Sequence, residues 1–122
     1  MKRMDRERRL MRRVGRGLLC GLFSCLLLEA GSFDRNCLPC HRKEGVSLRR
    51  TFMNALLVYS GERNMKAGLK YFLRHPSVET SVMGRDYFRH HSLKAPTTLS
   101  DRELEEALDE YWERYKVIGN LE

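Results

Sequence analysis

Apolar residues of this 122-residue chain recur at helical spacing in three successive segments, 48–59, 65–73 and 104–115. No segment alternates apolar and polar residues in the way that a half-buried strand does. A further short helix is expected over 33–41, and Gly45 offers a natural end for it. The sequence therefore predicts an all-α fold of about four to five short helices.

The last helix carries the clearest local signal in the chain. Ser100 and Glu103 have the spacing of a capping box, in which each side chain bonds the backbone N–H of the other residue. One apolar face follows, made of Leu104, Ala107, Leu108, Tyr111, Trp112 and Tyr115. Gly119 is the expected end of this helix. Residues 76–98 have no clean period and are predicted to be mainly loop, with one helical turn around 86–90.

The first 30 residues differ in composition from the rest of the chain. Eight of the 23 Lys and Arg residues fall within 1–16, an apolar run covers 17–28, and a short small-residue segment follows at 29–32. This order is typical of a secretory signal peptide, and an uncleaved run of this kind serves as an anchor. We expect a signal peptide or N-terminal membrane anchor over 1–30, a folded domain over 31–122 and a periplasmic location.

The formal net charge of +7 belongs mostly to that leading segment. From residue 31 onward, 15 Lys and Arg residues face 13 Asp and Glu residues. Such a domain lacks the concentrated basic charge with which proteins bind nucleic acid. Nucleic acid is therefore not an expected partner, and contact with a membrane is expected only through an uncleaved N-terminal segment.

Two of the four cysteines lie in the apolar run, and the other two stand in the predicted domain at Cys37 and Cys40. With His41 they form the pattern Cys-x-x-Cys-His, which marks the attachment of haem c. Three other interpretations compete with it. A thioredoxin-like redox pair would follow a strand, a zinc site would need a second ligand pair, and the two thiols could form a simple disulfide.

The spacing of the motif has a chemical reason. Residues three apart on a helical turn share a face, so Cys37 and Cys40 can both form thioethers with the vinyl groups on one side of a porphyrin. His41 then lies under the iron as the proximal axial ligand. The expected cofactor is one covalently bound haem c with its iron.

With two flanking features, the motif resembles the class I cytochromes c over nearly all of residues 31–122. Phe33 lies four residues before Cys37, where that family has an aromatic residue on its first helix. The capped segment 99–115 is similar to the closing helix of the family. The resemblance implies a small class I cytochrome c-like fold around one covalent haem.

The same resemblance implies a methionine as the distal ligand, in an irregular segment before the last helix. Met83 stands in such a segment. Met53 and Met65 lie on apolar helical stripes, where methionine usually fills the core. The alternatives are a five-coordinate iron or ligation by His75, His90 or His91.

The sequence departs from the family pattern at two places. No proline occurs between His41 and Pro76, although a proline carbonyl commonly accepts the hydrogen bond of the proximal histidine in this family. A carbonyl of the 45–47 turn is expected to replace it, because a ligating histidine needs an outer acceptor. Gly84 follows Met83 where the family often has proline, so a looser loop is expected there.

An iron with both axial positions filled has no open site for a substrate, so the expected work is transfer of single electrons. The sequence contains no Ser-His-Asp set, carboxylate pair or glycine-rich phosphate loop, and we do not expect an enzyme. We expect a monomeric carrier between a membrane reductase and a terminal oxidase or a periplasmic oxidoreductase. The alternatives are a haem-bearing subunit of a larger periplasmic oxidoreductase complex and a haem-based sensor or ligand binder.

Two surfaces follow from this interpretation. The expected basic docking face for acidic partners consists of Arg42, Lys43, Arg49, Arg50, Lys66, Lys70 and Arg74. The expected haem wall consists of Phe52, Leu56, Tyr59, Leu69, Phe72 and Trp112. Exposure of the aromatic residues of the last helix would instead favour the subunit alternative.

Overall fold

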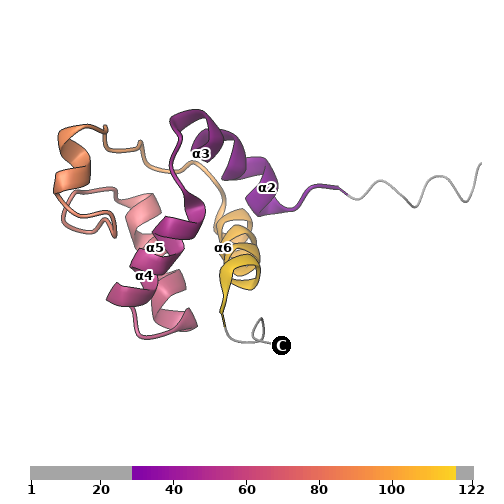
Figure 1. The fold of residues 1–122 in the computed structure, drawn as a ribbon. Coiled ribbons are helices and arrows are strands. Elements are labelled where there is room, and N and C mark those ends of the chain that lie inside the picture. The colour runs from indigo at the N-terminus through magenta and orange to yellow at the C-terminus, as the bar shows by residue number, and fades with distance from the viewer. Residues whose placement is uncertain (1–28, 118–122) are drawn as a thin grey trace, which may run out of the picture.

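The computed structural model describes residues 29–117, where helices are joined by loops and no strand is present (Figure 1). In chain order the elements are α2 (Ser32–Asn36), α3 (Leu38–Glu44), α4 (Leu48–Val58), α5 (Glu62–Arg74), the 3-10 helix η1 (Asp86–Arg89) and α6 (Asp101–Tyr115). The all-α prediction is confirmed for this part of the chain. The signal segment expected before residue 29 and the helix end expected at Gly119 lie outside the described residues.

Helix α2 packs against helix α6, so the two ends of the described chain meet (Figure 1). The ring of Phe33 on α2 stacks on the ring of Tyr111 on α6, with centroids 5.3 Å apart. The guanidinium of Arg114 lies 4.7 Å from the Phe33 centroid and is 2.7 Å from the carboxylate of Asp34. Stacking and charge therefore act together at this crossing.

Glu110 of α6 caps the N-terminus of α2. The backbone N–H groups of Ser32 and Phe33 donate to its two carboxylate oxygens, at 2.9 and 3.1 Å. The first amides of a helix have no partner within the helix and favour a nearby negative charge. Gly31 leaves the room for this cap, because a Cβ atom there would collide with the Glu110 carboxylate. Helix α6 thus supplies the cap that the sequence before α2 does not contain.

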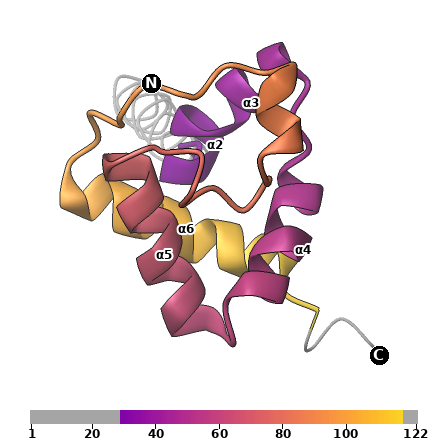
Figure 2. The same cartoon turned by 90° about the vertical axis from the view of Figure 1, so that its left-hand side faces the viewer.

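The core lies where α4 and α5 meet α6, which runs behind both of them in Figure 2. Phe52 of α4 is fully buried, and its ring centroid is 5.3 to 5.9 Å from those of Tyr111, Trp112 and Tyr115. The complete set of buried apolar side chains is Phe33, Phe52, Ala55, Met65, Leu69, Leu104, Ala107, Leu108 and Tyr111. The apolar face predicted for the last helix is therefore the centre of the fold.

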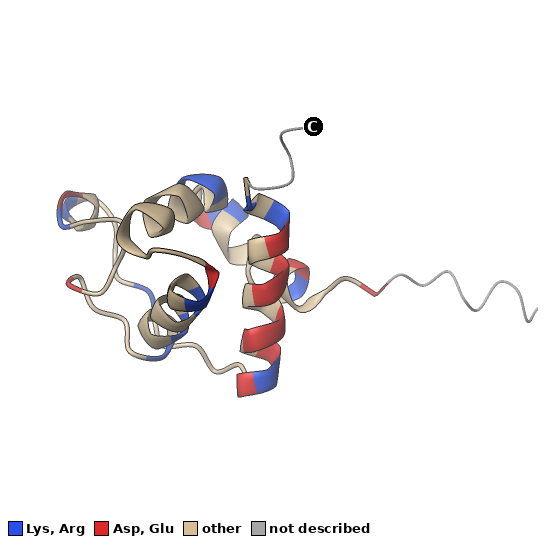
Figure 3. Ribbon diagram, turned by 90° about the horizontal axis from the view of Figure 1, so that it is seen from below, with Lys and Arg blue, Asp and Glu red and all other residues tan. Residues whose placement is uncertain are grey.

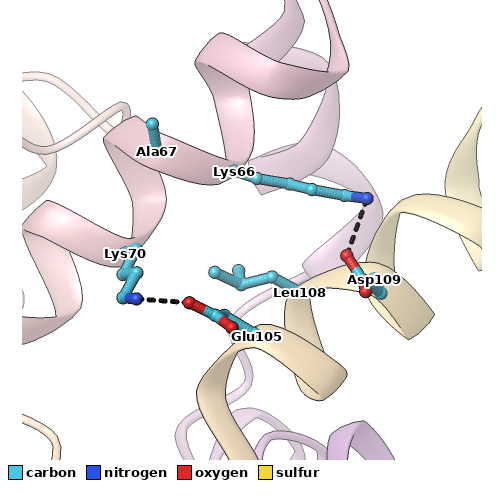
Figure 4. Close-up of a pocket in the computed structure, with 6 residues that line it drawn as sticks. All are labelled: Lys66, Ala67, Lys70, Glu105, Leu108 and Asp109. Atoms are coloured by element: carbon cyan, nitrogen blue, oxygen red, sulfur yellow. Dashed lines mark hydrogen bonds and ion pairs between the residues drawn. The ribbon is translucent and has the colours of Figure 1, made fainter. Parts of the chain in front are cut away.

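Ion pairs join α5 to α6 along one side of the molecule. The pairs are Lys66 with Asp109 at 2.8 Å, Lys70 with Glu105 at 2.6 Å and Arg74 with Asp101 at 2.9 Å. Acidic residues line α6 in Figure 3. The close-up in Figure 4 shows Leu108 between two of these ion pairs. The residues drawn there line a hollow of about 210 Å³. Each of these solvent-exposed ion pairs adds little to stability. Together they engage three of the basic residues of the expected docking face.

Local signals in the sequence are confirmed at several helix ends. Ser100 accepts from the N–H of Glu103 at 3.2 Å, and Glu103 accepts from the N–H of Ser100 at 2.9 Å, so the capping box is present. Helix α3 ends at Gly45, whose φ of 66° suits glycine. The short helix η1 lies within the predicted 86–90 turn.

Two expectations are wrong in detail. The helix expected over 33–41 is interrupted at Cys37, which ends α2 and begins α3 with φ −106°. Met53 is 45% exposed, whereas Met65 is buried in the core as expected. Met53 is exposed because α4 turns Phe52 and Ala55 inward, which directs Met53 outward.

Candidate functional site

The three residues of the Cys-x-x-Cys-His motif stand at the start of α3. Cys37 joins α2 to α3 and is half-buried, while Cys40 lies one turn further and is exposed. Neither thiol takes part in a disulfide. The His41 N–H donates to the Cys37 carbonyl at 3.2 Å, so the motif forms one hydrogen-bonded turn. Both thiols are therefore free of disulfides and stand one turn apart, with Cys37 against the core and Cys40 at the surface.

The ring of His41 is held by the turn that follows α3. Its Nδ1 atom lies 3.2 Å from the carbonyl oxygen of Val46. A carbonyl can only accept a hydrogen bond, so Nδ1 carries the proton and Nε2 keeps its lone pair. The structure therefore contains the expected contact between His41 and a carbonyl of the 45–47 turn. Nε2 is thereby left as the ring atom that could bind a metal.

The surroundings of the motif favour uncharged side chains. Burial lowers the pKa of His41, although its hydrogen bond to Val46 acts in the opposite direction. Burial also raises the pKa of the Cys37 thiol, and the carboxylate of Glu110 raises it further. A thiol that catalyses disulfide exchange needs a lowered pKa. The thioredoxin-like interpretation therefore has no support at Cys37, whereas a neutral imidazole is the form that binds a metal.

Lys94 also belongs to these surroundings, although no sequence signal points to it. Its charge lowers the pKa of both Cys37 and His41, although the side chain as a whole is exposed. Desolvation lowers the pKa of its own ammonium group, which donates to the carbonyl of Ala95 at 2.6 Å. No spacing rule connects this loop residue to the motif, so only the fold reveals the proximity.

Met83 lies in the loop before η1 and contacts α4. Its Sδ atom is 3.7 Å from the hydroxyl of Thr51 and 3.7 Å from the amide nitrogen of Asn54. The side chain is half-buried, and its N–H donates to the hydroxyl of Ser81 at 3.2 Å. Helix α4, which carries Thr51 and Asn54, begins at Leu48, two residues after Val46.

The three alternative histidine ligands stand on the surface. His75, His90 and His91 are all exposed. The ring of His91 stacks on Tyr87 with centroids 4.0 Å apart, and its Nδ1 atom is 3.0 Å from the Tyr87 carbonyl. The ring of His75 lies 5.2 Å from that of Tyr71. The rings of His75 and His91 thus have partners close by in the sequence. The choice of Met83 as distal ligand stays a prediction.

The residues expected to form a haem wall divide into two groups. Phe52 and Leu69 are buried among the helices, Trp112 packs against Phe52, and the Tyr59 ring lies over Gly68, where a Cβ atom would collide with it. Ordinary helix packing accounts for these side chains. Leu56 is half-buried and also packs against the core, which leaves the half-buried Phe72 as the remaining candidate.

A covalent haem of the c type requires two thiols one turn apart and a neutral imidazole beside the second thiol. Cys37, Cys40 and His41 fit this requirement in spacing, in the state of their side chains and in the hydrogen bond of the ring. Residues 29–117 contain no group of three or more His, Cys, Asp or Glu side chains that could hold a metal ion.

The helices between residues 29 and 117 are each too short or too polar to span a membrane. Comparison of the chain with protein-family models, with curated proteins and with solved structures gives no match.

Proposed function

We propose that this chain is an exported monohaem c-type cytochrome of class I type that transfers single electrons. Cys37 and Cys40 would bind the haem through thioethers, with His41 as proximal and Met83 as distal ligand. The observation that supports the proposal is the hydrogen bond from His41 Nδ1 to the Val46 carbonyl, which leaves Nε2 free to ligate a metal. When bound, haem supplies an iron centre that accepts and releases one electron.

The chain's own residues have distinct tasks in this proposal. The two thiols tether the cofactor, and the turn after α3 fixes the orientation of the His41 ring. Its lowered pKa keeps the imidazole neutral and able to ligate at physiological pH. With protein ligands on both sides there is no open position for a substrate, so we propose a carrier rather than an enzyme.

The basic docking face is smaller in this proposal than the sequence suggested. Lys66, Lys70 and Arg74 are engaged by acids of α6. The bases left for docking are Arg42, Lys43, Arg49 and Arg50, all exposed near the motif or on α4. Acidic redox partners, such as a membrane reductase, a terminal oxidase or a periplasmic oxidoreductase, would be attracted to this smaller face.

A pyridine haemochrome assay and an absorption spectrum of the exported protein test the proposal. We expect one covalent haem per chain and the charge-transfer band that methionine ligation gives to ferric haem. Met83→Leu should remove the band and lower the reduction potential, because a thioether favours the reduced iron. Met53→Leu is the matched control, since this methionine is exposed on α4, and it should leave both unchanged.

The possible results separate the parts of the proposal. Covalent haem without the band in the unmodified protein would contradict ligation by Met83 and favour a histidine ligand or an open-site sensor. A chain that matures without covalent haem in a host with the cytochrome c maturation system would contradict the cytochrome function itself.

A second candidate function, a haem-bearing subunit of a larger complex, is favoured by one specific observation. Helix α4 exposes three large apolar side chains, with Met53 45%, Leu57 88% and Val58 61% accessible. The aromatic residues of α6 are not the exposed ones, because Tyr111 is buried and Trp112 is half-buried. An apolar patch of this kind often marks a site of protein contact.

The elution volume of the mature holoprotein distinguishes the two functions. A carrier should elute as a monomer, and Leu57→Ser should not change its volume because this side chain supports no internal packing. Co-elution with a second protein from the native host that is lost in Leu57→Ser would instead support the subunit function. Val117→Ser is the matched control, since Val117 is also exposed but lies beyond the end of α6.

A further inference from the structure

The sulfur of Met83 lies against two polar side chains of α4. Thr51 and Asn54 are three residues apart, share one face of the helix, and each has a donor atom 3.7 Å from Sδ. Both residues are half-buried. Threonine and asparagine are also poor helix formers, so helix propensity gives no reason for their presence inside α4.

The proton of Thr51 is already engaged. Its hydroxyl donates to the carbonyl of Ser47 at 3.0 Å, which is a normal length for such a bond. A hydroxyl has only one proton, so it cannot serve the Ser47 carbonyl and the Met83 sulfur together. The amide of Asn54 has two N–H groups, and Met83 is its hydrogen-bond partner. Asn54 is therefore the donor to the sulfur.

The loop that carries Met83 contains glycine, not proline, directly after the methionine. Gly84 has φ +76°, which a proline cannot adopt because its ring fixes φ near about −65°. The loop is thus not braced by a proline after the methionine. Within the loop, the Met83 N–H donates to the Ser81 hydroxyl. This bond holds the backbone of Met83 but not its thioether.

We propose that Asn54 is the positioning residue for the Met83 thioether. Its N–H engages one lone pair of the sulfur, so the other would remain for a bound haem iron. By withdrawing electron density from the sulfur, the same bond would weaken donation to ferric iron and so raise the reduction potential. This inference rests on the proposed function, in which Met83 is the distal ligand.

The test compares reduction potentials of the purified holoproteins. Asn54→Leu removes the donor at similar size, and the equilibrium constant for reduction should fall about tenfold, or about 59 mV for one electron. The methionine charge-transfer band should weaken or shift as well. Asn54→Ala also lacks the N–H and adds no charge, so it should lower the potential in the same direction and serves if the leucine variant does not fold.

Thr51→Val is the matched control, and its reduction constant should stay within about twofold because its proton belongs to the Ser47 carbonyl. An unmodified protein with the charge-transfer band whose Asn54 variants keep the wild-type potential would overturn the role of Asn54 alone. Equal loss of potential in the Thr51 and Asn54 variants would also overturn it. A wild type without the band would overturn the ligation by Met83 and, with it, this inference.

Discussion

Replacement of Cys37 and Cys40 together by serine is expected to abolish covalent haem in the exported protein. A serine hydroxyl does not form the thioether that joins each cysteine to a vinyl group of the porphyrin. Both thiols are unpaired, and residues 29–117 contain no other cysteine. No other thiol in that range can therefore take their place. Haem staining after denaturing electrophoresis and the pyridine haemochrome spectrum measure the loss.

The single variants provide the internal control for this experiment. Cys37→Ser and Cys40→Ser each retain one thiol and should give a haemochrome band intermediate between those of two thioethers and none. Covalent haem in the double variant would show that the attachment is elsewhere in the chain. A single variant whose spectrum equals that of the unmodified protein would show that the thiol it lacks takes no part.

Phe52→Ala is expected to lower the free energy of unfolding of the holoprotein by about 3–5 kcal/mol. Phe52 is fully buried, and its ring contacts three aromatic rings of α6, so truncation leaves a cavity at the centre of the core. A loss of this size is a large part of the roughly 5–15 kcal/mol that stabilises a typical domain. Denaturant unfolding followed by circular dichroism gives the value.

Leu57→Ala is the matched control on the same helix. Leu57 is 88% exposed, and its truncation should change the free energy of unfolding by no more than about 0.5 kcal/mol. The slope of the unfolding free energy against denaturant concentration should be the same in both variants, because the surface exposed on unfolding hardly changes. A loss below about 1 kcal/mol for Phe52→Ala would contradict the central position of this ring.

The fold could be predicted from the sequence where the signals are local. The capping box at Ser100 and the glycine at position 45 fix helix ends through bonds between near neighbours, and both are present. The carbonyl partner of His41 was also predictable, because a histidine near the end of a short helix lies close to the few carbonyls of the next turn. Such features depend on short stretches of chain rather than on packing at a distance.

Features that depend on packing could not be predicted in the same way. Helix α4 has apolar residues on two faces, and periodicity alone does not show that Phe52 points inward and Met53 outward. The pairing of Lys66 and Lys70 with acids of α6 depends on how two helices meet. The break at Cys37, by contrast, has a local cause, because Pro39 stands in the first turn of α3 and its ring and missing N–H prevent a helix from continuing out of α2.

The candidate site divides along the same line. The motif at Cys37, Cys40 and His41 is read from adjacent residues, whereas the proximity of Lys94 and the contact of Asn54 with Met83 join distant segments. The attachment of haem and ligation by Met83 stay predictions, for which the cysteine and methionine variants are the tests.

The hydroxyl of Tyr111 donates to the carbonyl of Leu48 at 2.6 Å and so ties α6 to the first residue of α4. Leu48 is two residues after Val46, whose carbonyl holds the His41 ring. The segment that orients this imidazole is therefore secured by a residue near the end of the chain. During synthesis from the N-terminus, the cysteines emerge long before Tyr111, so the motif is available for chemical modification while its final support is still to be made.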